Sequence, residues 1–186
     1  GRLERLGLGP DVLHARNPRL VVTRVSGFGQ DGPYAERPGF ATIAEAMSGL
    51  AALSGEPDGQ PLLPPIALTD EVTGLAAAFA TMVALHSGVG QVVDANLLET
   101  MFQMMGPLVS LYGITGEQQP RLGAGLPYTV PRGTYRCSDG RWIAVPATTG
   151  LFLLPAEGGE PRAATTAGGA GTLDPSAAFS PDGRTL

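Results

Sequence analysis

The segment ALTDEVTGLAAAFATMVAL places two carboxylates, Asp70 and Glu71, at the entrance of an otherwise uncharged, alanine-rich stretch. Asp70 fits two roles. As an N-cap, its side chain accepts hydrogen bonds from the backbone N–H of Val72 or Thr73 and lies favourably in the helix dipole. As a nucleophile, the same carboxylate is held rigid and ionised at the helix end, where Gly74 leaves room for a ligand. Spacing alone leaves both roles open, with Glu71 solvated.

A glycine-rich stretch, Gly27-Phe28-Gly29-Gln30-Asp31-Gly32, formally matches the G-x-G-x-x-G pattern of dinucleotide-binding turns and follows a predicted strand. In that motif the third glycine opens a helix that receives the pyrophosphate. Here a proline follows at once, and QDGP is typical of a turn. The context therefore argues against a nicotinamide site, although free N–H groups of such a turn can still approach a phosphate or an amide.

The elements that must position these residues alternate between helix and strand, which predicts an α/β fold. The pattern predicts, in order, a helix over 3–15 interrupted by glycine and proline, a strand over 20–26, a helix over 40–55, a helix over 70–86, a short strand or helix approach over 92–96, a helix over 97–113, and a hairpin over 134–145.

Apolar side chains at helical spacing predict which helix faces are buried. In the helix over 70–86 they are Val72, Leu75, Phe79, Met82 and Val83. In the helix that starts near Phe40 they are Phe40, Ile43, Ala44, Met47 and Leu50. The methionines at 101, 104 and 105 are interpreted as core filler rather than as part of a cofactor site.

Composition excludes several classes of function. The formal net charge is -5 and all 12 basic residues are scattered arginines, which argues against a nucleic-acid partner. One cysteine, Cys137, and two distant histidines, His14 and His86, make no recognisable metal-ligand set. Arg132 and Arg141 flank the hairpin, where a solvated edge is the simpler interpretation. We expect a cytoplasmic protein with no membrane partner, because no leader is recognisable and the apolar segments are short or glycine-interrupted.

The order of the segments resembles family III CoA-transferases, the group that includes formyl-CoA transferase, carnitine CoA-transferase and related acyl-CoA racemases. The segments are VVTRVSGFGQDGPYAERPGFATIAEAMSGL, PIALTDEVTGLAAAFATMVAL, GQVVDANLLETMF and VPRGTYRCSDGRWIAVPATT. The resemblance covers residues 1–149 and implies a central fragment of that α/β fold, with a Rossmann-like large domain.

The resemblance implies a chemistry for Asp70, which stands where the family has its nucleophile. The carboxylate would attack an acyl-CoA thioester, pass through an aspartyl-CoA intermediate and hand CoA to a small carboxylic acid, with no metal. The stretch Ser26, Gly27, Phe28 and Gly29 lies where the family contacts CoA. The family's racemases use a histidine where this chain has Phe40, which argues against a racemase.

The resemblance ends near residue 149, which predicts two domains, 1–149 and 150–186. The second is rich in glycine, proline and alanine, with two strand-like pieces, 151–154 and 177–179, that lack partners; its FSPDG weakly resembles a β-propeller repeat. Family members are longer and dimeric, so a fragment of a homodimeric parent is expected. A non-catalytic interaction protein, whose tail pairs with another sheet edge, and an inactive gene fragment remain as alternatives.

Overall fold

The protein is described by a computed structural model over residues 1–129, 132–145, 152–154 and 162–163. The chain divides into two compact units. The first unit comprises Gly1–Ser54 and Pro61–Pro120, and the second comprises Gly55–Gln60 and Arg121–Leu186. Each unit is described below by itself.

The first unit is built on a two-stranded parallel sheet. Strand β1 (Val21–Ser26) pairs with β2 (Gln91–Asn96), with Val21 opposite Gln91 and Ser26 opposite Asn96. Strand β1 lies where it was predicted, and the segment over 92–96, left open between a short strand and a helix approach, belongs to strand β2. Parallel strands require a long connection, and here it contains three helices, α3 (Ala41–Met47), α4 (Leu50–Leu53) and α5 (Leu68–Ser87).

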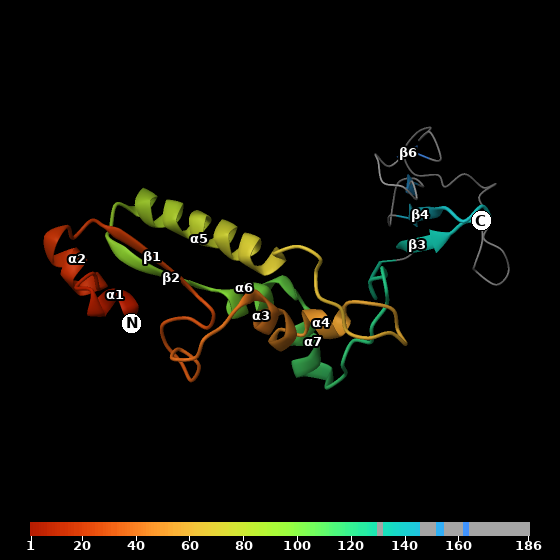
Figure 1. The fold of residues 1–186 in the computed structure, drawn as a ribbon, viewed down its shortest axis with the longest axis horizontal. Coiled ribbons are helices and arrows are strands. Elements are labelled where there is room, and N and C mark those ends of the chain that lie inside the picture. Colours follow the sequence, from red (N-terminus) through yellow and green to blue (C-terminus); the bar gives the residue numbers. More distant parts are fainter. Residues whose placement is uncertain (130–131, 146–151, 155–161, 164–186) are drawn as a thin grey trace. The chain divides into compact units, whose positions relative to one another are not determined.

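Helix α5 lies alongside this sheet (Figure 1) and contacts both strands. A hydrogen bond of 2.5 Å joins the hydroxyls of Thr23 on β1 and Thr81 on α5. Because the chain passes from the end of β1 through α3 and α4 into α5 and then back to the start of β2, α5 runs antiparallel to the strands. Its first turn therefore lies toward the end of the sheet at which β1 and β2 finish.

The opposite face of β1 meets the N-terminal helices, α1 (Arg2–Arg5) and α2 (Pro10–Arg16). Side chains alternate along a strand, so Arg24 projects away from α5, and its guanidinium pairs with Glu4 of α1 at 2.8 Å. His14 of α2 lies 3.0 Å from the Leu20 carbonyl through Nε2. The break between the two helices falls at the glycines and proline that predicted it.

The buried face of α5 consists of small residues, and the prediction that its large apolar residues form the buried stripe is wrong. The buried residues are Thr69, Thr73, Ala77 and Ala84. Leu75 and Phe79 are instead 72% and 73% exposed. Short side chains let the helix approach its neighbours closely, so the contact selects threonine and alanine over the residues with the larger hydropathy.

Helix α5 is the longest apolar segment in the described part of the chain, and Gly74 interrupts it. Its 20 residues, Leu68–Ser87, reach a mean hydropathy of 1.3 over the best window, of which 22% is buried. By length and composition alone it is the one helix in the described part of the chain that meets the requirement for a span.

The predicted helix over 40–55 is two helices, because Gly49 adopts a left-handed conformation with φ of 93° between α3 and α4. Of the residues predicted to be buried, Ala44 is buried, whereas Ile43 and Met47 are exposed. Ala44, Glu45, Ser48 and Ala51 are buried. Phe40, by contrast, is 72% exposed.

The predicted helix over 97–113 also divides, into α6 (Leu97–Met104) and α7 (Leu108–Thr115). Gly106, at φ of 59°, and the proline that follows it end the first helix. Met101 and Met105 are buried as predicted, whereas Met104 is 56% exposed. Two of the three methionines therefore fill the core of the first unit.

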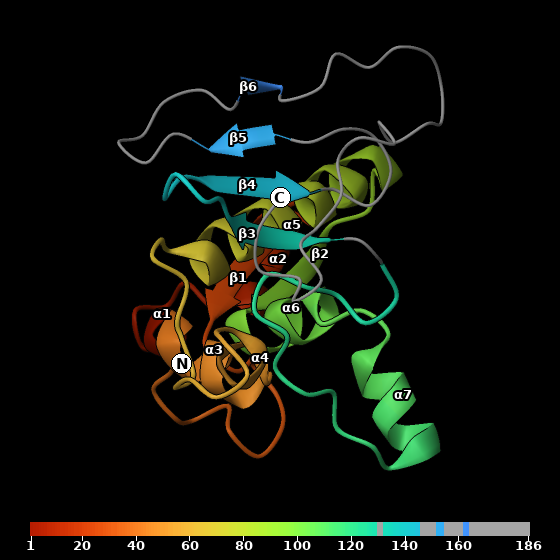
Figure 2. The ribbon, with the colours of Figure 1, turned by 90° about the vertical axis from the view of Figure 1, so that its right-hand side faces the viewer.

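The second unit contains an antiparallel sheet with strand order β3-β4-β5-β6 (Figure 2). The predicted hairpin is confirmed as β3 (Gly133–Arg136) and β4 (Trp142–Val145). Strand β5 (Phe152–Leu154) pairs with β4 and with β6 (Arg162–Ala163). The prediction that residues 151–154 form a strand without partners is therefore wrong. The predicted strand at 177–179 and the FSPDG segment lie outside the described residues, and the domain boundary after residue 149 stays a prediction.

The hairpin turn of the second unit is held by an ion pair. The Asp139 carboxylate accepts a hydrogen bond of 2.6 Å from Nε of Arg141 and one of 3.0 Å from its backbone N–H. These bonds, the side-chain one first, lower the pKa of Asp139 below its usual range. Cys137 packs against the buried pair Ile143 and Val145, which gives it a structural role.

Replacement of Ala77 by leucine tests the small-residue face of α5. We expect Ala77→Leu to lower the free energy of unfolding by about 1 to 3 kcal/mol, because the longer side chain has no space against the sheet. Ala78→Leu, at the neighbouring exposed position, is the matched control and should change it by less than about 0.5 kcal/mol. Urea denaturation measures both, and equal effects at the two positions would contradict this packing.

The titration of Asp139 tests the hairpin ion pair. Because its folded pKa is lowered, the pair stabilises the hairpin above the ordinary carboxyl pKa, and this contribution is lost as pH falls through the folded value. We expect Arg141→Gln to raise the Asp139 pKa toward the ordinary range of an aspartate carboxyl. Carboxyl NMR shifts measure it, with Arg136→Gln as the control; an unchanged pKa in Arg141→Gln would contradict the assignment.

Candidate functional site

Asp70 is the third residue of α5 and is exposed, and the interpretation of it as an N-cap is wrong. The N-cap position is held by Ala67, and no side chain caps this helix end. The helix begins earlier than predicted because the backbone N–H of Glu71 already bonds the Ala67 carbonyl at 3.0 Å. Within the described residues, Asp70 has no hydrogen-bond or ion-pair partner.

The first turn of α5 suits a reactive carboxylate. The positive end of the helix macrodipole stabilises negative charge there. No arginine pairs with Asp70 among the described residues, so neither an ion pair nor a cap occupies its oxygen atoms. Gly74, one turn further on, is exposed, and an added Cβ there would meet nothing within 4 Å. A substrate carbonyl can therefore approach this side of the helix.

Between the first turn of α5 and helix α3, the structure reveals a buried polar cluster that sequence reasoning missed. The Thr69 hydroxyl donates a hydrogen bond of 2.9 Å to Oε1 of Glu45 on α3. The Thr73 hydroxyl donates one of 2.7 Å to the Thr69 carbonyl. Glu45 is 4% exposed, and both threonines are fully buried. The available signal was a single acid in the apolar run ATIAEAM.

The loop after β1 forms a tight turn that brings together Ser26, Gly27, Phe28 and Gly29. The Ser26 hydroxyl accepts a 3.0 Å bond from the Gly29 N–H, and Gly29 has a φ of 88°. A Cβ added to Gly27 would lie 2.6 Å from the Gly39 Cα, so the loop and the segment before α3 touch backbone to backbone. Glycine is required at this crossing.

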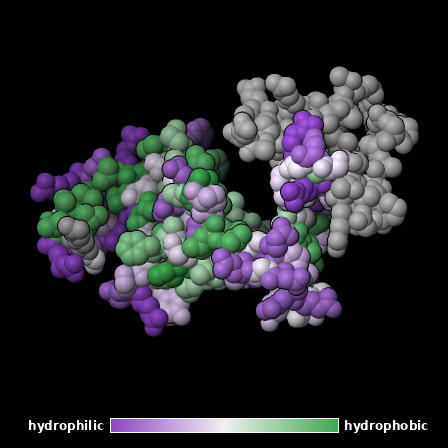
Figure 3. Space-filling view, turned by 45° about the vertical axis from the view of Figure 1, so that its right-hand side comes forward, coloured by the Kyte–Doolittle hydropathy of each residue, from purple (hydrophilic) through white to green (hydrophobic). Residues whose placement is uncertain are grey.

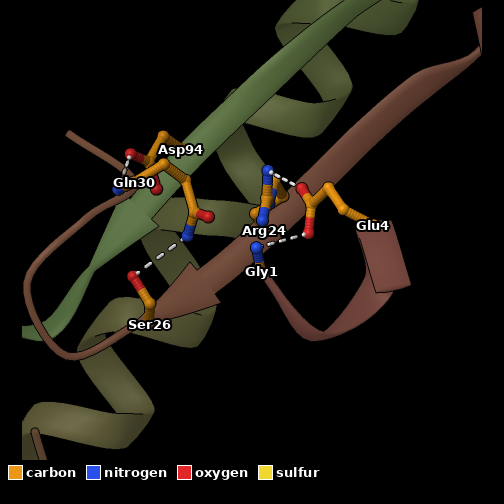
Figure 4. A network of polar contacts seen from close by, with 6 residues as sticks. All are labelled: Gly1, Glu4, Arg24, Ser26, Gln30 and Asp94. Atoms are coloured by element: carbon orange, nitrogen blue, oxygen red, sulfur yellow. Dashed lines mark hydrogen bonds and ion pairs between the residues drawn. The ribbon is translucent and has the colours of Figure 1, made fainter. Parts of the chain in front are cut away.

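The turn is anchored to β2 by a carboxylate (Figure 4). The Gln30 N–H donates a 2.6 Å hydrogen bond to Oδ2 of Asp94, and the Gln30 side chain reaches the Ser26 hydroxyl at 3.3 Å. The N–H groups of Gly29 and Gln30 are thus used within the protein. The G-x-G-x-x-G pattern opens no helix here, since the next helix starts at Ala41, which agrees with the argument against a dinucleotide site.

Asp70 and the turn at Ser26–Gly29 both lie toward the end of the first unit where the strands finish, the usual position of ligand sites in open α/β sheets. No hydrogen bond or ion pair joins Asp70 to this turn within the described residues. In the second unit, Arg132 donates to the Ala124 carbonyl at 3.1 Å and Arg141 pairs with Asp139, so both arginines have partners inside the chain. The described residues contain no group of three potential metal ligands.

The model of CoA-transferase family III matches residues 1–154. The chain belongs to CoA-transferase family III. It is 41% identical over 171 residues to a succinyl-CoA–D-citramalate CoA-transferase of Chloroflexus aurantiacus, covering 89% of this chain and 42% of the relative. It is 35% identical over 154 residues to a succinate–glutarate CoA-transferase of Agrobacterium fabrum, covering 81% and 38%.

A solved structure of a CaiB/BaiF family protein from Brucella suis supports the same assignment. It superposes with a TM-score of 0.70 and 34% sequence identity, over 78% of this chain and 39% of that one. The α/β fold that the resemblance implied is therefore confirmed. The chain spans about two fifths of the length of the curated relatives it matches, so activity, substrates and assembly are treated below as proposals.

Removal of the Asp94 carboxylate tests how the turn is held. In Asp94→Ala we expect the Gln30 amide to exchange with solvent about tenfold faster, because a charge-assisted hydrogen bond that protects it is lost. Asp31→Ala, in the same loop, is the control and should leave the exchange rate unchanged. Hydrogen exchange followed by NMR measures both; unchanged protection in Asp94→Ala would show that the turn does not depend on this bond.

Proposed function

We propose that this chain carries the nucleophile and part of the CoA-binding surface of an enzyme that transfers coenzyme A from an acyl-CoA to a carboxylic acid. The observation that carries the proposal is the carboxylate of Asp70 in the first turn of α5, exposed and without a partner among the described residues, in a chain that belongs to CoA-transferase family III. Since relatives are named for succinyl-CoA and succinate, succinyl-CoA is the proposed donor.

In the proposed first half-reaction, an oxygen of Asp70 attacks the thioester carbonyl carbon. The carbon–sulfur bond breaks, CoA leaves as its thiolate, and a mixed anhydride remains on Asp70. The thiolate then attacks the Asp70 carbonyl carbon, which releases the donor as a carboxylate and leaves an aspartyl-CoA thioester. Covalent catalysis of this kind divides one exchange into steps between activated acyl groups of similar energy.

In the second half-reaction, the acceptor carboxylate attacks the aspartyl-CoA carbonyl carbon and again expels CoA thiolate. The thiolate attacks the acceptor's acyl carbon, so a new acyl-CoA forms and the Asp70 carboxylate is regenerated. No proton, metal or redox partner enters the balance. The acid acceptor, a homodimeric assembly and a cytoplasmic location belong to this proposal.

We assign CoA contacts to the turn formed by Ser26, Gly27, Phe28 and Gly29. The internal bonds of Gly29 and Gln30 support a turn whose shape is already set before a ligand arrives. The rings of Phe28 and Tyr34 contact each other at a tilt of 55° with centroids 5.4 Å apart, and the Arg37 guanidinium lies 4.4 Å from the Tyr34 ring centre. An aromatic and cationic surface therefore adjoins the turn, which suits an anionic, ring-containing ligand such as CoA.

The experiment is incubation of the protein with succinyl-CoA, followed by intact-mass measurement and peptide mapping. We expect a CoA adduct on the Asp70 peptide and its absence in Asp70→Asn, with turnover reduced by a factor on the order of 10³ or more. Glu71→Gln, one residue along, is the matched control and should keep both adduct and turnover. An adduct that persists in Asp70→Asn would contradict the assignment of the nucleophile.

A further inference from the structure

The buried cluster of Glu45, Thr69 and Thr73, next to Asp70 in the chain, calls for an explanation. A carboxylate is costly to bury unless it is hydrogen-bonded, yet Glu45 is 4% exposed in the middle of α3. The hydrogen bond described for its side chain comes from Thr69, the residue directly before the proposed nucleophile. A simple helix contact needs only apolar side chains.

The contacts of Thr69 fix the backbone from which Asp70 projects. Its hydroxyl is bound to Glu45, and its carbonyl accepts a hydrogen bond from the Thr73 hydroxyl. The peptide unit that joins Thr69 to Asp70 is planar. A carbonyl fixed on one side of that plane therefore also fixes the N–H and the Cα of Asp70.

The orientation of the two neighbours completes the argument. Successive residues on a helix are turned by about 100° from each other, so Thr69 can be fully buried while Asp70 is exposed. Threonine has a stiff, branched side chain, which makes it a firm point of attachment. The N-terminus of α5 has no side-chain cap, and the hydrogen bond from Thr69 to Glu45 ties its first turn to α3.

We propose that Glu45 and Thr69 are positioning residues: their buried hydrogen bond holds the first turn of α5 so that the Asp70 carboxylate meets the thioester carbonyl at the correct angle. This inference rests on the proposed function of Asp70. Nucleophiles misplaced by a fraction of a bond length lose rate without losing substrate affinity. The pair thus acts on the rate of attack rather than on CoA binding.

The test measures two quantities in a single turnover with succinyl-CoA. The first is the maximal rate of CoA-adduct formation on Asp70, and the second is the succinyl-CoA concentration that gives half of that rate. Thr69→Val should slow adduct formation about tenfold and leave that concentration unchanged. Thr69→Ser keeps the hydroxyl, and Glu45→Gln keeps Oε1 as an acceptor. Both variants should therefore form the adduct at nearly the rate of the unchanged protein. If Thr69→Val folds and forms the adduct at an unchanged rate, the inference is overturned.

A matched control separates positioning from stability. The Thr81 hydroxyl lies on the same helix, bonds the Ala77 carbonyl at 2.7 Å and reaches another element through Thr23. Thr81→Val therefore removes the same group from a comparable contact, far along the helix from Asp70. We expect it to lower thermal stability and leave the adduct rate unchanged. An equal loss of rate in Thr81→Val would show that the effect is general and overturn the proposal.

A double variant covers the case in which Thr69→Val fails to fold because Glu45 is left buried without its partner. Glu45→Leu combined with Thr69→Val replaces both groups with apolar ones, which is often neutral for stability. A folded double variant with slow adduct formation supports positioning, and one with an unchanged rate overturns it. If the unchanged protein itself forms no adduct on Asp70, the proposed function fails first, and the inference fails with it.

Discussion

The close contact between the small-residue face of α5 and its neighbours is the constraint on which the first unit depends. Thr69, Thr73, Ala77 and Ala84 let the helix lie against the sheet and against α3 and α6. Their size determines the rotation of the helix about its axis. That rotation turns Thr69 inward to Glu45 and leaves Asp70 outward at the end of the helix. Packing and the position of the proposed nucleophile are thus one consequence of the same side chains.

The sequence predicted the positions of the strands and helices, but it missed the breaks within two helices and misassigned helix faces. The strands, the hairpin and the breaks at Gly7 and Gly9 follow from strong local signals, in which β-branched runs and turn residues leave few alternatives. Buried faces were misassigned on α5 and α3 because hydropathy favours large residues, whereas close approach favours alanine and threonine. Leu75, Phe79 and Phe40 are all exposed, and Figure 3 shows apolar residues on the face of the molecule that it presents.

Asp70 was within reach of sequence reasoning as a candidate, since a carboxylate at a helix entrance is a readable pattern. The choice between cap and nucleophile was not, because it depends on where the helix begins. The structure starts α5 at Leu68 and gives the N-cap position to Ala67. Glu45 was beyond reach for a different reason: its partner is 24 residues away in sequence, and no local pattern links an acid in one helix to a threonine in another.

The measurement that tests the central claim most directly follows an oxygen atom. The protein is incubated with an acyl-CoA and an acceptor acid whose carboxylate is labelled with a heavy oxygen isotope. The mass of the Asp70 peptide is then measured by mass spectrometry. If Asp70 forms the proposed anhydride, cleavage at the acceptor's acyl carbon leaves the bridging oxygen on Asp70, and the peptide gains the heavy isotope over repeated turnovers. Direct attack of the acceptor on the donor thioester would send the label to the released donor acid. An unlabelled Asp70 peptide after turnover would contradict the account.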